Sequence, residues 1–224
     1  MGSAVTIRPT RVFIALMARE PSTTHIFHIT DVTNLPSILQ AGGLRSDAAI
    51  LSSGTQVTNI AYSHIKQRRL TQYRVPSAGN RFVGEFVPFY FCQRSPMLFT
   101  INNGNTGLPA GSQSTILHFV STVAAGIATG RPWAISDGNA GSGYAEFSSD
   151  LGMLDRLDWD AIKADYWQNR QHEKMAEFLV ADFFEWGNVI GIGCHNELVQ
   201  QAVQGIIKDA QHQPGVKVLP RWYY

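Results

Sequence analysis

Two segments of the sequence, 83–92 and 115–122, are largely uninterrupted apolar runs with the length of β-strands. A strand with one face in water alternates apolar and polar residues, so such runs indicate strands that are covered on both faces. Residues at helical spacing predict a helix over about 197–210 that packs on the sheet. Because strands and helices are interleaved without a regular alternation, the sequence predicts an α+β fold. Four more stretches have strand-like composition: 25–30, 132–136, 178–184 and 189–194.

A short helix is predicted directly after the strand-like stretch 25–30. Thr33 or Asn34 carries the kind of side chain that caps a helix N-terminus, and Pro36 suits the first turn. Gly42 and Gly43 follow, and glycine readily adopts the left-handed conformation in which many helices end.

The size and composition of the chain fit a single domain over residues 1–224. Of its 224 residues, 44% are hydrophobic and 16% charged, which allows one sizeable core and excludes a disordered protein. Cys92 and Cys194 form no C-x-x-C motif, so neither a disulfide framework nor a zinc ribbon is expected. No segment approaches the roughly 20 apolar residues of a membrane helix, and the run 12–17 lacks a signal-peptide cleavage pattern. We therefore expect a cytoplasmic monomer without membrane association.

Charge is unevenly distributed along the chain. The formal net charge is only +1, which by itself indicates neither a nucleic-acid nor a membrane partner. Segment 61–94, however, holds six Lys and Arg residues against one Glu, whereas segment 146–165 holds six acidic residues against two basic ones. The acidic segment is a possible protein-binding face, although most charged segments are simply solvated.

Common catalytic signatures are absent from the sequence. There is no Walker loop, G-x-G-x-x-G, G-x-S-x-G or H-E-x-x-H motif. His172 is followed by a glutamate, but the residue four positions on is Ala176, so the second ligand of a zinc site is missing. No metal site is therefore predicted.

Polar groups stand within apolar or basic surroundings in four segments: 27–30, 64–69, 86–97 and 175–180. A histidine placed like His28, among apolar neighbours on a strand, is more often a satisfied structural residue than a ligand contact. The basic cluster 64–69 has the alternative of a solvated helix face. Burying an ionised carboxylate is costly without a partner, so Glu177 must lie at a rim or be paired.

In their order and spacing, these segments resemble the DarT-type DNA ADP-ribosyltransferase toxins. These bacterial enzymes transfer ADP-ribose from NAD to a base in single-stranded DNA. The resemblance covers most of the chain. It is carried by 28–30 with 34–39, by 65–69, by 87–91 with 94–98, by 133–139, by 176–180 and by 221–224.

The resemblance implies the ADP-ribosyltransferase fold, in which two facing antiparallel sheets with flanking helices surround an NAD cleft. In that fold a histidine on the central strand binds an NAD ribose, an arginine binds the phosphates, and aromatic residues lie near nicotinamide. A packing role remains open for one of the two aromatic residues, and two adjacent arginines cannot be told apart from one sequence. The residues expected at NAD are His28, Thr30, Arg68, Arg69, Phe89 and Tyr90.

Glu177 and Arg68 are the expected catalytic residues. Loss of nicotinamide leaves an oxocarbenium-like ribose, and a carboxylate bonded to its 2′-hydroxyl would stabilise the positive charge. An arginine would grip the diphosphate through paired hydrogen bonds, which Lys66 could imitate only as a point charge. Thymine N3 must lose a proton before it attacks, and Glu177 is the expected base, a contribution typically worth ~10²–10⁴-fold.

The loop that precedes Glu177 is expected to shape the acceptor side of the site. It combines aromatic and cationic side chains, as single-stranded nucleic-acid sites do, although an amphipathic surface turn is the alternative. The basic segment 61–94 would extend the track for the DNA backbone. The predicted DNA-binding residues are Tyr166, Trp167, Arg170, His172 and Lys174.

The sequence thus predicts an NAD-dependent toxin that transfers ADP-ribose to thymine in single-stranded DNA in a sequence-specific manner, without a metal. One alternative keeps the chemistry but modifies guanine or RNA, and another is a non-catalytic nucleic-acid-binding module with the same fold. A protein-arginine transferase is disfavoured, because Met175 stands where that class has a second acidic residue. Marking template bases would harm the host cell, so the resemblance also implies a macrodomain antitoxin as partner.

Overall fold

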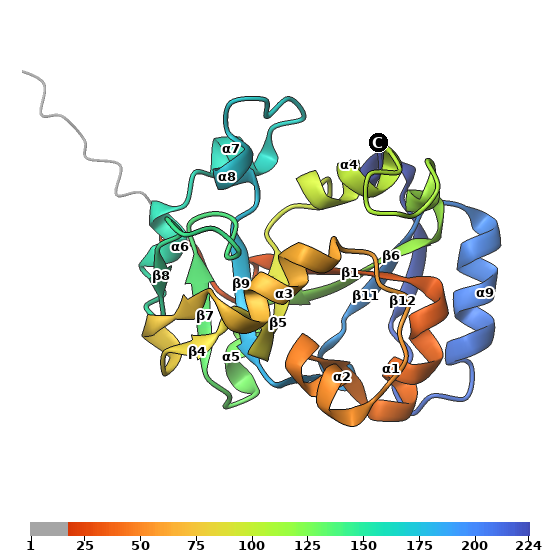
Figure 1. Cartoon of the computed structure of the whole chain (residues 1–224). Helices are drawn as coiled ribbons and strands as arrows, with labels where there is room; N and C mark the ends of the chain where they lie inside the picture. Colours follow the sequence, from red (N-terminus) through yellow and green to blue (C-terminus); the bar gives the residue numbers. More distant parts are fainter. Residues whose placement is uncertain (1–17) are drawn as a thin grey trace, which may run out of the picture.

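The computed structural model describes residues 18–224 and is built around an eight-stranded sheet (Figure 1). Neighbouring strands are antiparallel except for the parallel pair β11 and β12 at one edge. In spatial order the strands are β12 (Gly215–Val218), β11 (Gly191–Cys194), β6 (Ile116–Thr122), β1 (His25–Asp31), β5 (Phe86–Tyr90), β9 (Glu177–Ala181), β7 (Trp133–Ser136) and β8 (Phe147–Ser148). The apolar run 12–17 lies outside the described residues.

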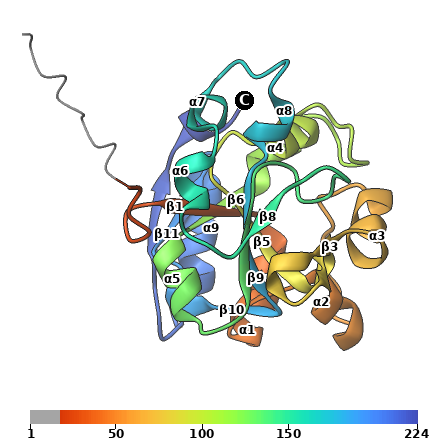
Figure 2. The ribbon, with the colours of Figure 1, turned by 90° about the vertical axis from the view of Figure 1, so that its left-hand side faces the viewer.

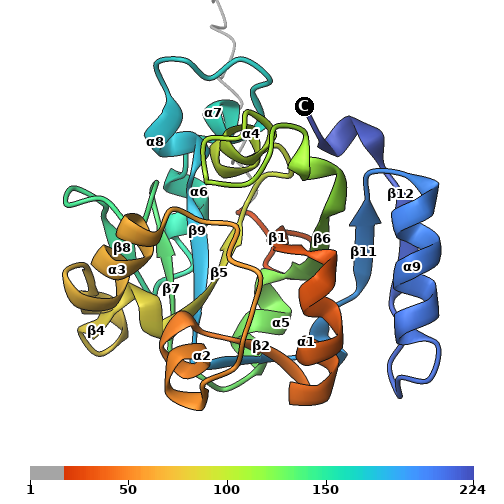
Figure 3. The same ribbon diagram turned by 45° about the vertical axis from the view of Figure 1, so that its right-hand side comes forward.

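The sheet consists of two halves that meet at a narrow junction. β1 pairs with β6 along its whole length, but its register with β5 is a single pair, Phe27 with Tyr90. Figure 3 shows β5, β7 and β9 on one side of this junction and β6, β11 and β12 on the other. The two expected antiparallel sheets are therefore joined into one continuous sheet, with the parallel β11–β12 pair as an addition.

The apolar runs 83–92 and 115–122 predicted strands covered on both faces, and most residues of β5 and β6 are indeed buried. All five residues of β9 are buried, and so are most residues of β6. In Figure 2, α5 (Val123–Ala128), α6 (Met153–Arg156) and α9 (Glu197–Ile207) lie on one side of β9, and α2 (Asp47–Ser53) and α3 (Ser63–Thr71) lie on the other. A Cβ atom at Gly126 of α5 would lie 2.3 Å from the ring of Phe178, so glycine is required for this close contact.

The remaining helices and strands are short. Two small sheets pair β10 (Phe183–Glu185) with β2 (Gly43–Arg45) and β3 (Arg74–Val75) with β4 (Arg81–Phe82). The other helices are α1 (Leu35–Ala41), α4 (Pro96–Asn102), α7 (Trp159–Lys163) and α8 (Gln171–Lys174). Within residues 18–224, none of the helices is long and apolar enough to cross a membrane.

Helix α1 confirms the predicted position but not the predicted cap. Gly42 ends it with φ 77°, and Pro36 lies in its first turn. The capping side chain, however, is that of Asp31, which accepts the Thr33 N–H at 2.9 Å and begins a 3₁₀ turn ahead of the helix. Asn34 is used elsewhere: its side chain bonds the main chain of Thr58 at 2.7 and 3.0 Å. These two hydrogen bonds hold the segment 57–61 close to the end of β1.

Two predicted strands are shorter than their apolar runs. Residues 83–85 form a 3₁₀ turn before β5 begins. The run 178–184 is divided at Asp182, whose positive φ of 64° turns the chain away from β9 and into the pairing of β10 with β2. Arg81 forms an ion pair with Asp182 and holds this bend.

Candidate active site

A cavity of about 220 Å³ opens beside the junction between β1 and β5. Its walls come from β1, β5, the first residue of β9, α2, α3 and the segment 57–61, so the two halves of the sheet both contribute. Its polar and charged lining side chains are His28, Thr30, Asn34, Arg45, Asp47, Thr58, Asn59, Lys66, Arg69, Tyr90, Asn139 and Glu177.

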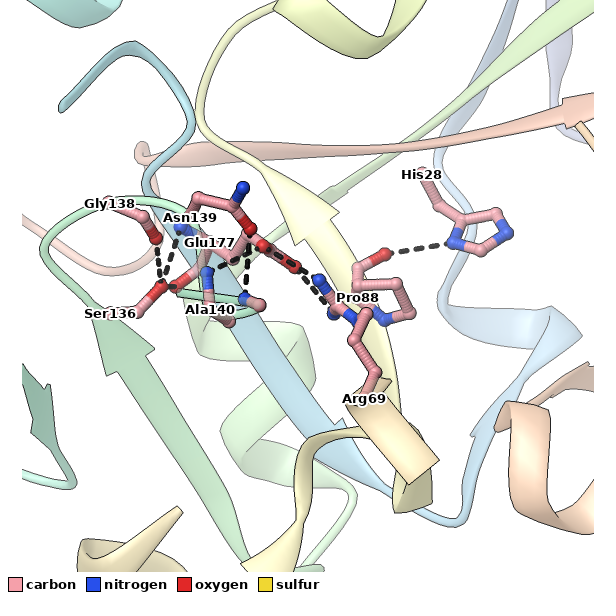
Figure 4. A network of polar contacts seen from close by, with 9 residues as sticks. His28, Arg69, Pro88, Ser136, Gly138, Asn139, Ala140 and Glu177 are labelled. Atoms are coloured by element: carbon pink, nitrogen blue, oxygen red, sulfur yellow. Dashed lines mark hydrogen bonds and ion pairs between the residues drawn. The ribbon is translucent and has the colours of Figure 1, made fainter. Parts of the chain in front are cut away.

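Glu177 is fully buried at the start of β9 and is held on several sides (Figure 4). Both carboxylate oxygens accept from Arg69, Oε1 from Nη1 at 3.1 Å and Oε2 from Nη2 at 2.8 Å. Oε1 also accepts the main-chain N–H of Ala140 at 3.0 Å. At the backbone, the Glu177 N–H donates to Ser136 Oγ at 3.2 Å. Of the two sequence-based options for this carboxylate, the structure shows the paired one.

Arg69 reaches Glu177 from the last turn of α3. Burial by itself would lower the pKa of this guanidinium, but the Glu177 carboxylate and its hydrogen bonds more than offset that effect and raise the pKa. The forked geometry gives two parallel charge-assisted hydrogen bonds, which fix the orientation of the carboxylate. Arg69 therefore positions Glu177 before any substrate arrives.

His28 lines the cavity as a neutral imidazole. Burial lowers its pKa, and Nδ1 lies 2.8 Å from the carbonyl oxygen of Pro88. A carbonyl only accepts, so Nδ1 must carry the proton and Nε2 must be an acceptor. Thr30, two residues on along the same strand, also lines the cavity. This arrangement fits recognition of a hydroxyl group, such as that of a ribose.

The two aromatic residues expected at nicotinamide face opposite ways. Tyr90 lines the cavity, and burial together with the nearby Glu177 charge raises the pKa of its hydroxyl, which stays protonated as a hydrogen-bond donor. Phe89 points into the core, where its ring packs 4.7 Å from Phe184. Successive strand residues alternate in direction, which explains why only one of the pair reaches the cavity.

The structure separates the two adjacent arginines. Arg69 lines the cavity with its side chain only 14% exposed, whereas Arg68 is exposed and bonds Tyr73 and Gln72 outside it. Most cations of the segment 61–94 are also neutralised locally by ion pairs with carboxylates. These pairs are Lys66 with Asp47, Arg69 with Glu177, Arg81 with Glu85 and Asp182, and Arg94 with Asp165.

Arg45 is a cavity residue that sequence reasoning missed. It ends β2 and lines both this cavity and a neighbouring hollow beside α1 and α2. Among residues 18–224 it has no ion-pair partner and its side chain makes no hydrogen bond, whereas the other two cationic residues of the cavity, Lys66 and Arg69, are paired. Arg45 belongs to no motif or periodic pattern in the sequence, so nothing there marked it as a cavity residue.

The loop before Glu177 is only partly available to a ligand. Tyr166 is 82% exposed, whereas the indole N–H of Trp167 donates to the hydroxyl of Tyr224 at 3.2 Å. Arg170 is ion-paired with Asp158. Lys174 does not belong to an exposed cationic surface, because it is 3% exposed and its ammonium donates to two main-chain carbonyls, those of residues 162 and 164, at 2.7 Å each.

His172, in α8 at the end of this loop, lies against the segment that follows β7. Its ring is 4.6 Å from that of Tyr144, and its Nε2 is 3.4 Å from a carboxylate oxygen of Asp137. No group of three or more potential metal-ligating side chains occurs in the described part of the chain. His172 contacts the segment 137–146, whose Ala140 N–H bonds the Glu177 carboxylate.

Comparison with known proteins identifies the family. The profile described as "ssDNA thymidine ADP-ribosyltransferase, DarT" matches residues 27–224. A Thermus aquaticus protein named DNA ADP-ribosyl transferase is 42% identical over 91% of this chain and 90% of its own length.

Two solved structures of DarT from Thermus sp. 2.9 are similar as well. The complex with ADP-ribosylated single-stranded DNA has a TM-score of 0.85 at 36% identity, over 93% of this chain and 100% of the other. The complex with NAD⁺ has a TM-score of 0.80 at 34% identity, over 92% and 99%. The expected ADP-ribosyltransferase fold is thus confirmed, and the chain belongs to the DarT family as a DNA ADP-ribosyltransferase that uses NAD.

Proposed function

We propose that this enzyme transfers ADP-ribose from NAD to thymine in single-stranded DNA, within a short sequence context. The observation that carries the proposal is the position of Glu177, buried and ion-paired at one wall of the cavity that His28 lines at another. The similar Thermus enzyme in complex with ADP-ribosylated single-stranded DNA supports the acceptor class, and the matched profile's description supports thymine.

The paired carboxylate fits the donor half of the reaction. Nicotinamide leaves as a neutral molecule and positive charge develops on the ribose, so a negative group fixed beside the sugar stabilises the transition state. Arg69 and the Ala140 N–H already orient the Glu177 carboxylate, so it need not reorganise during the reaction. Electrostatic stabilisation is most effective from groups fixed in this way.

Binding of NAD would use the other walls of the cavity. Nε2 of His28 can accept a hydrogen bond from a ribose hydroxyl, and Tyr90 offers a protonated hydroxyl. We assign the diphosphate to Arg45 and not to Arg68, because Arg68 lies outside the cavity. Arg69 would have to abandon a buried ion pair to take this role, and leaving Glu177 unpaired would be costly.

The acceptor half of the reaction requires a base, since N3 of thymine is protonated. After nicotinamide has gone, Glu177 is the carboxylate at the reacting end of the cavity and can take this proton. Arg69 stays beside the carboxylate as its positioning residue, and the ion pair is restored when Glu177 releases the proton to solvent. A single carboxylate thereby serves both halves of the transfer.

The substitution Glu177→Gln tests this assignment. Glutamine can still accept the Ala140 N–H, so the fold and some NAD binding should be retained, while transfer to DNA should fall by at least ~10²-fold. The assay incubates the enzyme with NAD and a degenerate single-stranded oligonucleotide pool, and mass spectrometry identifies the adduct. A Glu177→Gln variant that modified DNA at the parent's rate would refute the assignment. An adduct on guanine, or on RNA alone, would show that the acceptor is one of the alternatives and not thymine in DNA.

The same chemistry bears on the biological setting. An enzyme that modifies template bases damages the cell that makes it, so we propose that it acts as a toxin in the cytoplasm, where DNA and NAD are both present. Its proposed partner is a macrodomain antitoxin that removes ADP-ribose from DNA. Co-expression with such a macrodomain should restore growth that the active enzyme arrests, and it should have no effect on cells that express Glu177→Gln.

A further inference from the structure

Tyr144, in the segment 137–146 that follows β7, is an exposed aromatic residue whose exposure is not explained by packing within the described residues. Its side chain is 72% exposed, and within the described residues its hydroxyl makes no hydrogen bond. Its ring lies 4.6 Å from the ring of His172, at an angle of 44°. One side of the phenol ring is therefore backed by an imidazole, and the rest faces solvent.

The backing residue is itself fixed. A Cβ atom at Gly138 would lie 2.3 Å from Nε2 of His172, so only glycine lets this ring rest against the loop. The side chain of His172 is 16% exposed. Asp137 closes the base of the loop through two bonds with Glu146, its N–H donating to the carbonyl at 3.1 Å and its carboxylate accepting the N–H at 2.9 Å. Tyr144 thus stands on a supported loop.

The loop that carries Tyr144 also forms part of the active site. Its Ala140 N–H bonds the Glu177 carboxylate at 3.0 Å, and Asn139 lines the cavity. Tyr144 is four positions after Ala140, so their Cα atoms are at most about 14 Å apart. At about 3.4 Å per stacked nucleotide, this distance corresponds to no more than about four nucleotides.

A cation also lies near this loop, next to Tyr73. A Cβ atom at Gly143 would lie 3.9 Å from the ring of Tyr73, and the hydroxyl of Tyr73 accepts a hydrogen bond from Arg68. Arg68 is exposed and has no carboxylate partner among the described residues. An aromatic surface next to an unpaired cation is the combination with which proteins bind single-stranded nucleic acid.

We propose that Tyr144, backed by His172, stacks on a nucleobase that flanks the acceptor base, and that Arg68 binds the adjacent backbone phosphate. The inference rests on the proposed modification of single-stranded DNA. It gives Arg68 a role in holding the acceptor strand in place of a role at NAD. It also makes Tyr144 a residue that selects the sequence around the acceptor.

The test compares Tyr144→Ala with Tyr144→Phe, using Leu198→Ala on the distant helix α9 as the control for loss of an exposed apolar side chain. For Tyr144→Ala, kcat/KM for a single-stranded oligonucleotide should fall by about 5- to 150-fold, the range measured for loss of one stacked base. Tyr144→Phe should stay close to the parent because it keeps the ring. Nicotinamide release from NAD without DNA should be unchanged in all three variants.

Abasic substrates identify the stacked base. In the parent enzyme, removing one particular flanking base should reduce transfer, and the same removal should have no further effect in Tyr144→Ala. Arg68→Ala should reduce the slope of log affinity against log salt by about one, whereas Tyr144→Ala should leave that slope intact.

The inference is refuted if Tyr144→Ala transfers ADP-ribose at the parent's kcat/KM, or if every abasic position affects parent and variant equally. A parent enzyme that released nicotinamide but modified no DNA at all would refute the proposed function instead.

Discussion

Neutralising Arg69 should destabilise the protein chiefly by leaving Glu177 buried without its partner. The side chains of Arg69 and Glu177 are only 14% and 1% exposed, so water cannot replace the lost contacts. Breaking a buried ion pair from one side typically costs about 3–5 kcal/mol. Because the Ala140 N–H still bonds the carboxylate, we expect Arg69→Met to fall at the lower end, about 3 kcal/mol. In a chain of this size that corresponds to a fall in Tm of roughly 6–12 °C.

A double-mutant cycle measures the pair itself. Arg69→Met keeps an apolar stem and removes the charge, and Glu177→Gln removes the opposite charge. When both charges are absent no buried ion remains uncompensated, so the double variant should be more stable than the sum of the two single losses predicts, by at least about 1 kcal/mol. Urea denaturation followed by circular dichroism gives the free energies of unfolding. Additive effects within about 0.5 kcal/mol, or an Arg69→Met variant that melts with the parent, would refute this account of the pair.

Three further predictions concern other charged or titratable groups. Arg45→Ala should raise KM for NAD about tenfold with little change in kcat, because it removes one charge-assisted contact to phosphate; an unchanged KM in steady-state assays would exclude it from the diphosphate site. Lys174→Met should lower the free energy of unfolding by about 1–3 kcal/mol, because two carbonyls lose their donor, yet leave the salt dependence of DNA binding unchanged; a smaller salt slope would show that Lys174 contacts DNA. Burial lowers the pKa of His118 to about 4, so the unfolded chain binds more protons and stability should fall, on the order of 3 kcal/mol, as the pH drops from about 6.5 to 4. Denaturation of His118→Gln should show a shallower decline, and an identical decline would assign the effect to other groups.

The sequence was informative where one strong pattern determines one element. The apolar runs predicted β5 and β6 as buried strands, the stretch 178–184 predicted a strand where β9 lies, and Gly42 predicted the end of α1. The breaks in these strands were not predictable, because Asp182 adopts its positive φ only where Arg81 and the pairing of β10 with β2 hold it. Such a bend depends on residues distant in the sequence.

Local sequence patterns could not show which of Arg68 and Arg69 faces the cavity. Successive helical residues are rotated by about 100°, so Arg68 and Arg69 point in different directions, and of the two only Arg69 lines the cavity. A helix normally shows its inner face by an apolar stripe, but α3 has only two apolar residues, Ile65 and Leu70, and none of its residues is fully buried. The buried face of α3 is defined by Glu177, more than a hundred residues away in sequence. The hydrogen bond from the main-chain N–H of Ala140 to Glu177 could not be predicted either, because it does not depend on the type of side chain.

The structure divides the site into a fixed interior and an open rim. Glu177 is held by the side chain of Arg69 and the main-chain N–H of Ala140, so replacing Arg69 or Glu177 leaves a buried polar group without its partner. Tyr144 and Arg68 stand on exposed segments, and replacing either removes no buried hydrogen bond. DNA sequence preference can therefore change through the rim without loss of the catalytic carboxylate. It follows that exchanging residues 142–146 with the corresponding segment of a relative should alter the preferred flanking base while nicotinamide release stays intact.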